Sequence, residues 1–214
     1  MPIKLKSVGG GEITIDAPNT ASNYTVTLPA SNATVLNSES TLDATKLSGA
    51  VPLGSLSNTT TLTRATSVTA SGTTVDFTGI PAWAKRITVM FNGVSTSGAS
   101  IVQIQVGDSG GIKTTGYNST GISQSNGGVV LSSSVNGFIV SGNVAATQTH
   151  SGIATLCNLG SNVWVFNSLA KQATNQNAYA AGEFTGTGTL DRIRITTVNG
   201  TDTFDAGTIN IMYE

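Results

Sequence analysis

Residues 102–111 read Val-Gln-Ile-Gln-Val-Gly-Asp-Ser-Gly-Gly, and this stretch decides the fold class. Val102, Ile104 and Val106 alternate with two glutamines, which is the two-residue period of a strand with one buried face. The glycine-rich run after Val106 is typical of a tight turn. The stretch therefore predicts a β-strand that ends in a turn.

The same alternation recurs through the C-terminal part of the chain. Glycine-rich breaks at residues 107–111, 127–128 and 182–188 separate the apolar segments. Roughly eight antiparallel strands with regular turns predict an all-β domain, a β-sandwich with a jelly-roll-like topology. Strands are expected near residues 75–77, 87–91, 102–106, 129–131, 135–140, 153–159, 162–166, 193–195 and 209–213.

The composition excludes several classes of protein. Only 10% of the 214 residues are charged, against about 25% in an ordinary globular domain. Lys and Arg number 10 and Asp and Glu 11, so the chain offers no basic field to a nucleic acid. No run approaches about 18 apolar residues, so we expect no membrane insertion. Few charges are available to protect sheet edges, which favours an oligomer.

The pattern divides the chain into three zones. Residues 1–37 hold alternating segments at 12–16 and 24–28 and predict a small N-terminal β module. Because a domain below about 40 residues rarely buries a sufficient core, this module is expected to pack on a neighbouring chain or a larger assembly. Residues 38–67 form a connector, and residues 68–214 are long enough for the complete β-sandwich domain.

The connector is rich in small polar residues but also holds six large apolar ones. It is either a flexible linker or an extended stalk, and a short helix over residues 40–47 fits its sequence. Leaving an apolar side chain in water rather than burying it costs roughly 1.5–3 kcal/mol. We therefore favour a stalk in which these residues meet across a symmetry axis. The stalk or oligomer-interface candidates are Leu42, Leu47, Val51, Leu53, Leu56 and Leu62.

The sequence around Ser109 matches the GDSGG of chymotrypsin-like proteases. That chemistry needs a histidine base, which in that family precedes the serine, and His150, the only histidine, follows it. The run is therefore interpreted as a turn in which Asp108 caps the backbone. No catalytic residue is assigned.

Metal and cofactor sites are not indicated either. One cysteine and one histidine form neither a disulfide framework nor a Cys/His zinc site. His150 is expected in a loop, and Cys157 is expected to be a small buried strand residue. Asp202 and Asp205 are a calcium-site alternative, but we interpret them as solvated turn residues.

Two tyrosines, Tyr117 and Tyr179, lie in polar segments that read as loops. An exposed aromatic ring beside Asn, Gln and Thr suits stacking on a sugar and hydrogen bonding, although such rings also occur without a ligand. These two residues are the receptor-contact candidates.

Two parts of the chain resemble proteins of tailed bacteriophages. Residues 11–30 (GEITIDAPNTASNYTVTLPA), 33–36 (ATVL) and 42–52 (LDATKLSGAVP) resemble a module and connector near the start of phage fibre and virion structural proteins. Residues 76–89 (DFTGIPAWAKRITV) and 106–111 (VGDSGG) are similar to a recurrent C-terminal domain of phage tail fibres. The resemblance implies a homotrimeric β-rich fibre, docked on other virion proteins through its N-terminal part and facing the host with its C-terminal part.

Two functions follow as expectations. The first is a receptor-binding fibre on the phage particle, at its tail, that adsorbs the phage to a surface glycan or protein of the host. The second is a purely structural head fibre, decoration protein or collar component. A depolymerase is a third alternative, but it needs a carboxylate pair or a long β-helix, and neither is visible.

Overall fold

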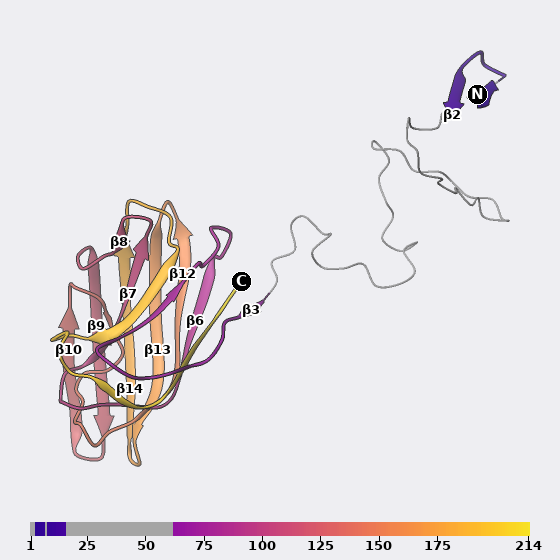
Figure 1. Ribbon diagram of the computed structural model, residues 1–214. Helices are drawn as coiled ribbons and strands as arrows, with labels where there is room; N and C mark the ends of the chain where they lie inside the picture. The colour runs from indigo at the N-terminus through magenta and orange to yellow at the C-terminus, as the bar shows by residue number, and fades with distance from the viewer. Residues whose placement is uncertain (1–2, 7, 16–61) are drawn as a thin grey trace. The chain divides into compact units, whose positions relative to one another are not determined.

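The computed structural model describes residues 3–6, 8–15 and 62–214 of the chain (Figure 1). The chain divides into two compact units, Met1–Ala50 and Val51–Glu214, and each is described by itself. Within the described residues, no helix is long and apolar enough to cross a membrane.

The described part of the first unit is an antiparallel hairpin. β1 (Ile3–Lys6) pairs with β2 (Glu12–Ile15), and Lys4 Nζ lies 2.6 Å from Glu12 Oε1. Because both side chains are solvated, this ion pair contributes little stability. β2 confirms the strand expected from residue 12, whereas β1 was not predicted. The strand expected at residues 24–28 and the helix considered at 40–47 lie outside the described residues.

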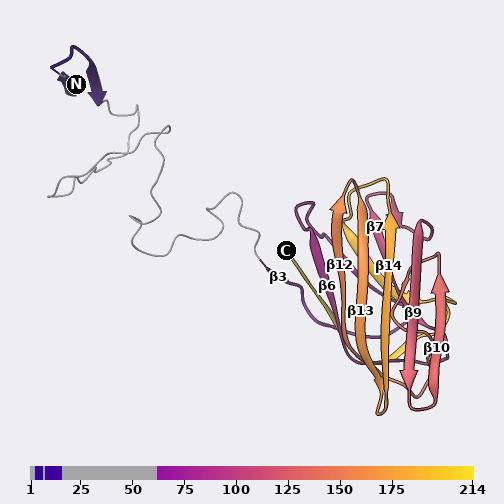
Figure 2. The same cartoon turned by 180° about the vertical axis from the view of Figure 1, so that it is seen from behind.

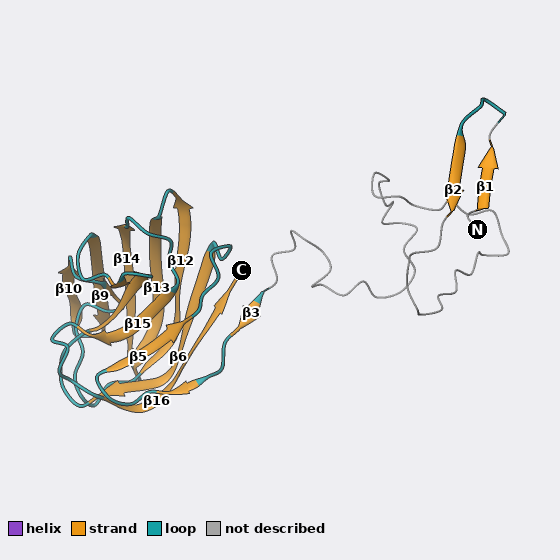
Figure 3. Ribbon diagram, turned by 45° about the horizontal axis from the view of Figure 1, so that its top comes forward, coloured by secondary structure: helices purple, strands orange, loops and turns teal. Residues whose placement is uncertain are grey.

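The second unit is built from strands and loops, without a helix in residues 62–214, and its strands form two antiparallel sheets (Figure 3). The small sheet contains β5 (Thr74–Thr78), β7 (Val102–Asp108), β8 (Gly111–Ile112), β11 (Phe138–Ile139) and β15 (Arg192–Thr197). The large sheet contains β3 (Thr63–Arg64), β4 (Val68–Thr69), β6 (Arg86–Thr96), β9 (Tyr117–Ser125), β10 (Gly128–Ser134), β12 (His150–Gly160), β13 (Val163–Ala173), β14 (Gln176–Thr185) and β16 (Phe204–Tyr213).

The strand order confirms an all-β, sandwich-like fold but not the predicted jelly roll. The large sheet runs β10-β9-β14-β13-β12-β6-β16-β3, with β4 also on β16, and the small sheet runs β11-β7-β15-β5, with β8 on β7. β12, β13 and β14 are a meander rather than part of an eight-strand jelly roll. The cause is local: Ser161 and Asn162 both have positive φ, as a two-residue hairpin turn requires, so β12 pairs with the next strand.

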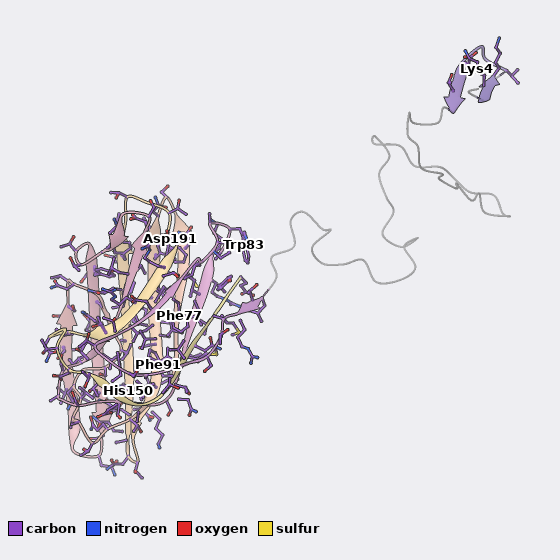
Figure 4. All side chains as sticks on the ribbon, viewed as in Figure 1. Lys4, Phe77, Trp83, Phe91, His150 and Asp191 are labelled. Atoms are coloured by element: carbon purple, nitrogen blue, oxygen red, sulfur yellow. The ribbon has the colours of Figure 1, made fainter. Side chains whose placement is uncertain are left out.

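One hydrophobic core lies between the sheets. Ile104 and Ile193 enter it from the small sheet, and Val89, Leu156 and Ile211 enter from the large sheet, all of them fully buried. Figure 4 shows where two further members of this core, Phe77 and Phe91, lie in the sandwich. The alternating residues that predicted the strands are thus the residues that hold the two sheets together.

Near the start of β12, hydrogen bonds replace apolar packing. Gln172 of β13 is fully buried; its Oε1 accepts from Ser123 Oγ at 2.6 Å, and its Nε2 donates to Gln148 Oε1 at 3.1 Å. Gln148 in turn donates to Gln176 Oε1 at 2.6 Å. This amide network ties the loop between β11 and β12 to three strands of the large sheet.

Most of the expected strands are confirmed, and two long strands, β9 and β14, were missed together with the short β1, β3, β4 and β8. The segments expected in β5, β6, β7, β10, β12, β13, β15 and β16 are strands, whereas only Phe138–Ile139 of residues 135–140 is one. β9 and β14 were read as loops, which is wrong. Apart from Tyr117 and Phe184 at one end, their inward apolar positions hold small residues, so the strands lack the alternation of large apolar residues: Ser119, Gly121, Ser123, Ala178 and Ala180.

Candidate functional site

The glycine-rich segment after β7 is a structural turn, as predicted. The Gly110 N–H donates to Asp108 Oδ1 at 2.8 Å, and Lys113 Nζ lies 2.8 Å from the same oxygen. The bond from Lys113 lowers the pKa of Asp108 below its usual value, so the carboxylate stays charged and holds the turn.

His150 is not in a loop, which corrects the prediction. It is the first residue of β12 and is buried, and neither ring nitrogen has a hydrogen-bond partner within the described part of the chain. The turn around Ser109 lies next to Asp191, whose N–H donates to Gly107 O. Figure 4 shows Asp191 and His150 toward opposite ends of the domain. The structure therefore does not bring Ser109 and His150 together.

The two aspartates considered as calcium ligands form hydrogen bonds within the domain, and Cys157 belongs to no metal-binding cluster in the described residues. Asp202 Oδ1 accepts from Asn199 Nδ2 at 2.8 Å, and its other oxygen accepts from the Ser100 N–H at 2.9 Å, so Asp202 caps a turn. Ser95 Oγ donates to Asp205. Among the described residues, no cluster of three or more His, Cys, Asp and Glu side chains could hold a metal ion. Cys157 is in a strand but only half-buried, so the expectation of burial is wrong.

Tyr117 is a core residue, so its assignment as a receptor-contact candidate is corrected. It begins β9 and is 4% exposed. Its hydroxyl accepts from the Val106 N–H at 2.8 Å and donates to Lys113 O at 3.1 Å, and its ring meets Phe138 edge-on at 5.0 Å between centroids. Burial raises the pKa of this phenol well above its ordinary value. The hydroxyl is thus a partner of the β7 backbone.

Tyr179 is exposed, but it lies in a strand rather than a loop. It sits in β14 on the outward surface of the large sheet, directly opposite Leu169 and Ile122. Of the stalk candidates only Leu62 is among the described residues, and it is exposed just before β3, which pairs with β16. The other five candidates lie outside the described residues: Leu42, Leu47, Val51, Leu53 and Leu56.

The outward surface of the small sheet carries a polar hollow of about 320 Å³. In its floor Thr196 of β15 is directly opposite Thr74 of β5 and Gln103 of β7, and Arg194 is opposite Gln105. Apart from Val198 and Gly200, every lining residue carries a hydroxyl, amide or guanidinium group: Thr74, Gln103, Gln105, Thr114, Asn136, Arg194, Thr196, Thr197 and Asn199.

One wall of the hollow is the loop before β11. Gln105 Nε2 donates to the Asn136 carbonyl at 2.9 Å. A Cβ at position 137 would lie 2.8 Å from Gln103 Oε1, so Gly137 allows the loop to cross the sheet closely. Gln103 is 3% exposed, and its Oε1 has no hydrogen-bond partner within the described residues. The hollow therefore contains an unused acceptor, whose burial without a partner costs free energy.

Arg194, the one positively charged side chain among the described residues that line the hollow, is neutralised by Asp76. Arg194 Nε lies 2.8 Å from Asp76 Oδ1 and Nη2 lies 2.7 Å from Oδ2, and this pairing raises the pKa of Arg194. A guanidinium has five N–H donors in a fixed plane, and the pair uses two, so the remaining donors are available to a ligand. The amides, hydroxyls and balanced charge suit a neutral ligand with many hydroxyl groups.

Comparisons with protein-family models, with curated proteins and with solved structures found no match for this chain. Sequence reasoning missed the hollow because its residues come from separate strands and loops. The alternation of Gln103 and Gln105 with core residues does indicate that both point outward, and that was the signal present in the sequence.

Proposed function

We propose that the chain is a fibre protein of a tailed-bacteriophage particle whose C-terminal domain binds a surface glycan of the bacterial host. Residues 1–37 attach it to other virion proteins, residues 38–67 form the stalk, and the fibre is a homotrimer located at the tail. The phage assignment comes from the sequence resemblance. The proposal assigns no reaction, cofactor or metal to the chain.

The polar hollow is the observation that carries the host-binding role. Saccharides present many hydroxyls, and protein sites hold them through hydrogen bonds from amides, hydroxyls and charged groups in fixed positions. Gln103 lines the hollow with its unpaired Oε1 buried beneath the loop at Gly137, and Arg194 is oriented by its bond to Asp76. A fibre displays several copies of such a weak site, and avidity then supplies firm attachment.

The test uses two matched substitutions on one strand. Thr74→Arg places a long charged side chain in the hollow, whereas Thr78→Arg places the same side chain at the other end of β5, where it is also exposed. Fluorescently labelled full chain is added to a panel of bacterial strains, with purified surface polysaccharide as competitor. We expect Thr74→Arg to lower binding at least tenfold and Thr78→Arg to leave it unchanged. Equal binding by the two variants, or no binding to any strain, would contradict the role of the hollow.

The purely structural role remains the second candidate because of the large sheet. Its outward surface exposes large apolar residues, among them Leu169 and Tyr179, which suit packing against protein rather than hydration. Antibody labelling of virions by electron microscopy separates the two functions. Label on the capsid, with normal adsorption after removal of the protein, would select the structural role.

A further inference from the structure

The large sheet leaves a broad surface open to solvent on the side away from the core. We call this surface the outer face and define it by the outward side chains of β6, β12, β13, β14, β9 and β10. These six strands lie side by side, as Figure 2 shows from behind. Over the central part of these strands the pairing is in register, so outward residues form straight rows across the sheet.

The central row of the outer face is apolar on all six strands. Each member lies directly opposite the next across a strand pair, and the row consists of Met90, Ile153, Leu169, Tyr179, Ile122 and Leu131. Leu131 is 63% exposed, Ile153 and Leu169 are each 52% exposed, and Tyr179 is 41% exposed. A single exposed leucine is ordinary, but a continuous row of this length marks an interaction site.

The rows beside it are uncharged with few exceptions. On one side lie Thr88, Thr155, Asn167, Ala181, Thr120 and Ser133, and on the other Ser151, Lys171, Asn177, Gln124 and Val129. Beyond the first of these rows, Cys157, Val165 and Glu183 continue the face. Arg86 continues this row on β6 and is paired with Glu214, and Lys171 and Glu183 carry opposite charges, so the charges on the face are balanced.

The size of the outer face matches a stable protein interface. Its rows contain about twenty side chains, and a standard interface uses roughly 20–30 residues on each side. Interface cores are depleted in charge and combine aromatic and apolar residues with a polar rim, which is the arrangement of this row and its neighbours. The face therefore has the area and composition that burial against another folded surface requires.

Charge decides which partner fits. A strongly acidic or basic partner would find no complementary field on this face, and a glycan would meet an apolar row instead of hydrogen-bonding groups. A second copy of the same chain meets no net repulsion, because Lys171 balances Glu183 and Glu214 neutralises Arg86 within each copy. Every copy also carries the same apolar row, so two copies can bury their rows together.

We propose that the outer face is the surface on which a second copy of this chain packs, with Leu169 and Tyr179 at the centre of the contact. Tyr179 is then an interface residue rather than a receptor contact. The inference rests on the large sheet alone and does not depend on glycan binding in the hollow.

The chain contains a probe for this contact. Cys157 is the only cysteine, and it lies on the outer face between Arg86 and Val165 in neighbouring strands. It is half-buried in the single chain. When a second copy covers the face, the rate at which a maleimide modifies this thiol falls.

The test compares the full chain with two variants. Leu169→Lys places a charge in the central row, and Val135→Lys places the same charge at an exposed apolar position outside the central row, in the loop that leads from β10 to β11 of the small sheet. Light scattering is expected to give a multiple of 21.7 kDa for the unmodified chain and for Val135→Lys, and a smaller mass for Leu169→Lys. Cys157 is expected to react at least tenfold faster in Leu169→Lys than in the other two proteins.

Three results would overturn the proposal. One is a monomeric full chain. A monomer in which Cys157 reacts slowly counts equally against the proposal, because another part of the same chain would then cover the face. Another is an unchanged oligomer in Leu169→Lys with an unchanged rate at Cys157. The third is an oligomer of the full chain in which Cys157 reacts freely, because the contact would then lie elsewhere. If Leu169→Lys failed to fold, the concentration dependence of the Cys157 rate in the unmodified chain would decide: the rate falls with association if the proposal holds and stays constant if it is wrong.

Discussion

Acidification from pH 7.5 to pH 4 is expected to destabilise the C-terminal domain through one side chain, His150. The imidazole is 1% exposed, and neither nitrogen has a hydrogen-bond partner among the described residues. Burial lowers the pKa of His150 to about 4, and the neighbouring Val94 backbone opposes this effect only in part. The folded domain therefore holds a neutral histidine at a pH where the unfolded chain holds a charged one.

The magnitude and sign follow from proton linkage. The unfolded-state pKa of 6.5 and the folded-state pKa of about 4 differ by about 2.5, and each pKa unit corresponds to about 1.36 kcal/mol. Between these values the unfolded chain binds a proton that the folded chain does not, so the free energy of unfolding decreases as the pH falls. Above pH 6.5 His150 is neutral in both states and costs the fold no stability from protonation. As the pH falls to about 4, the free energy of unfolding decreases by about 3 kcal/mol.

The assay compares the unmodified chain with His150→Leu in denaturant unfolding at pH 7.5, 6, 5 and 4. Leucine has a similar volume and needs no hydrogen bond, and all other titrating groups are common to both proteins. The difference between their free energies of unfolding isolates His150 and is expected to change by about 3 kcal/mol across this range. Because the chain has one histidine, its imidazole proton resonances also give the folded-state pKa directly.

Either of two results would refute this reasoning. One is an imidazole that titrates near pH 6.5 in the folded protein. The other is a difference between the two proteins that stays constant with pH to within about 0.5 kcal/mol, which is a small part of the expected linkage.

Three further substitutions test the packing. Tyr117→Phe leaves the buried Val106 N–H without its partner and is expected to cost about 1–3 kcal/mol of unfolding free energy in a denaturant titration; no measurable loss would contradict the assigned bond. Gln172→Met removes the centre of the amide network and is expected to lower the thermal midpoint by several degrees, since about 1 kcal/mol corresponds to roughly 2–4 °C in a domain of this size; an unchanged midpoint would argue against the network. Gly142→Ala places a Cβ against the Val130 carbonyl and is expected to cost about 1–3 kcal/mol or to prevent folding, whereas a fully stable variant would mean that this loop lies differently.

The sequence predicts strands where large apolar residues alternate, and it misses strands whose inward residues are small. In β15, Ile193 and Ile195 alternate with arginines, so the strand is visible. In β14 the inward residues include Ala178 and Ala180, and in β9 they include Ser123, which is buried because it bonds to Gln172. A pattern based on hydrophobicity does not register a hydroxyl that becomes satisfied only in the folded state.

The hollow and the outer face could not be predicted, because both are formed by the pairing of strands that are distant in the sequence. Gln103 and Thr197 lie 94 residues apart in the chain but share a hydrogen bond in the hollow. The outer face likewise exists because five strand pairs are in register, so that Ile153, Leu169 and Tyr179 fall in one row. Tyr117 shows the same limit for a single residue, since its burial follows from the Val106 N–H that it reaches from a neighbouring sheet.

The hollow and the outer face belong to different sheets and share no side chain. Packed sheets are about 10 Å apart, and here a core fills the space between them. A substitution at Thr74 thus leaves the Leu169 row untouched, and the reverse also holds, because the effects of distant substitutions add independently. The two surfaces can therefore diverge at separate rates in related chains, with variation on one sheet and constancy on the other.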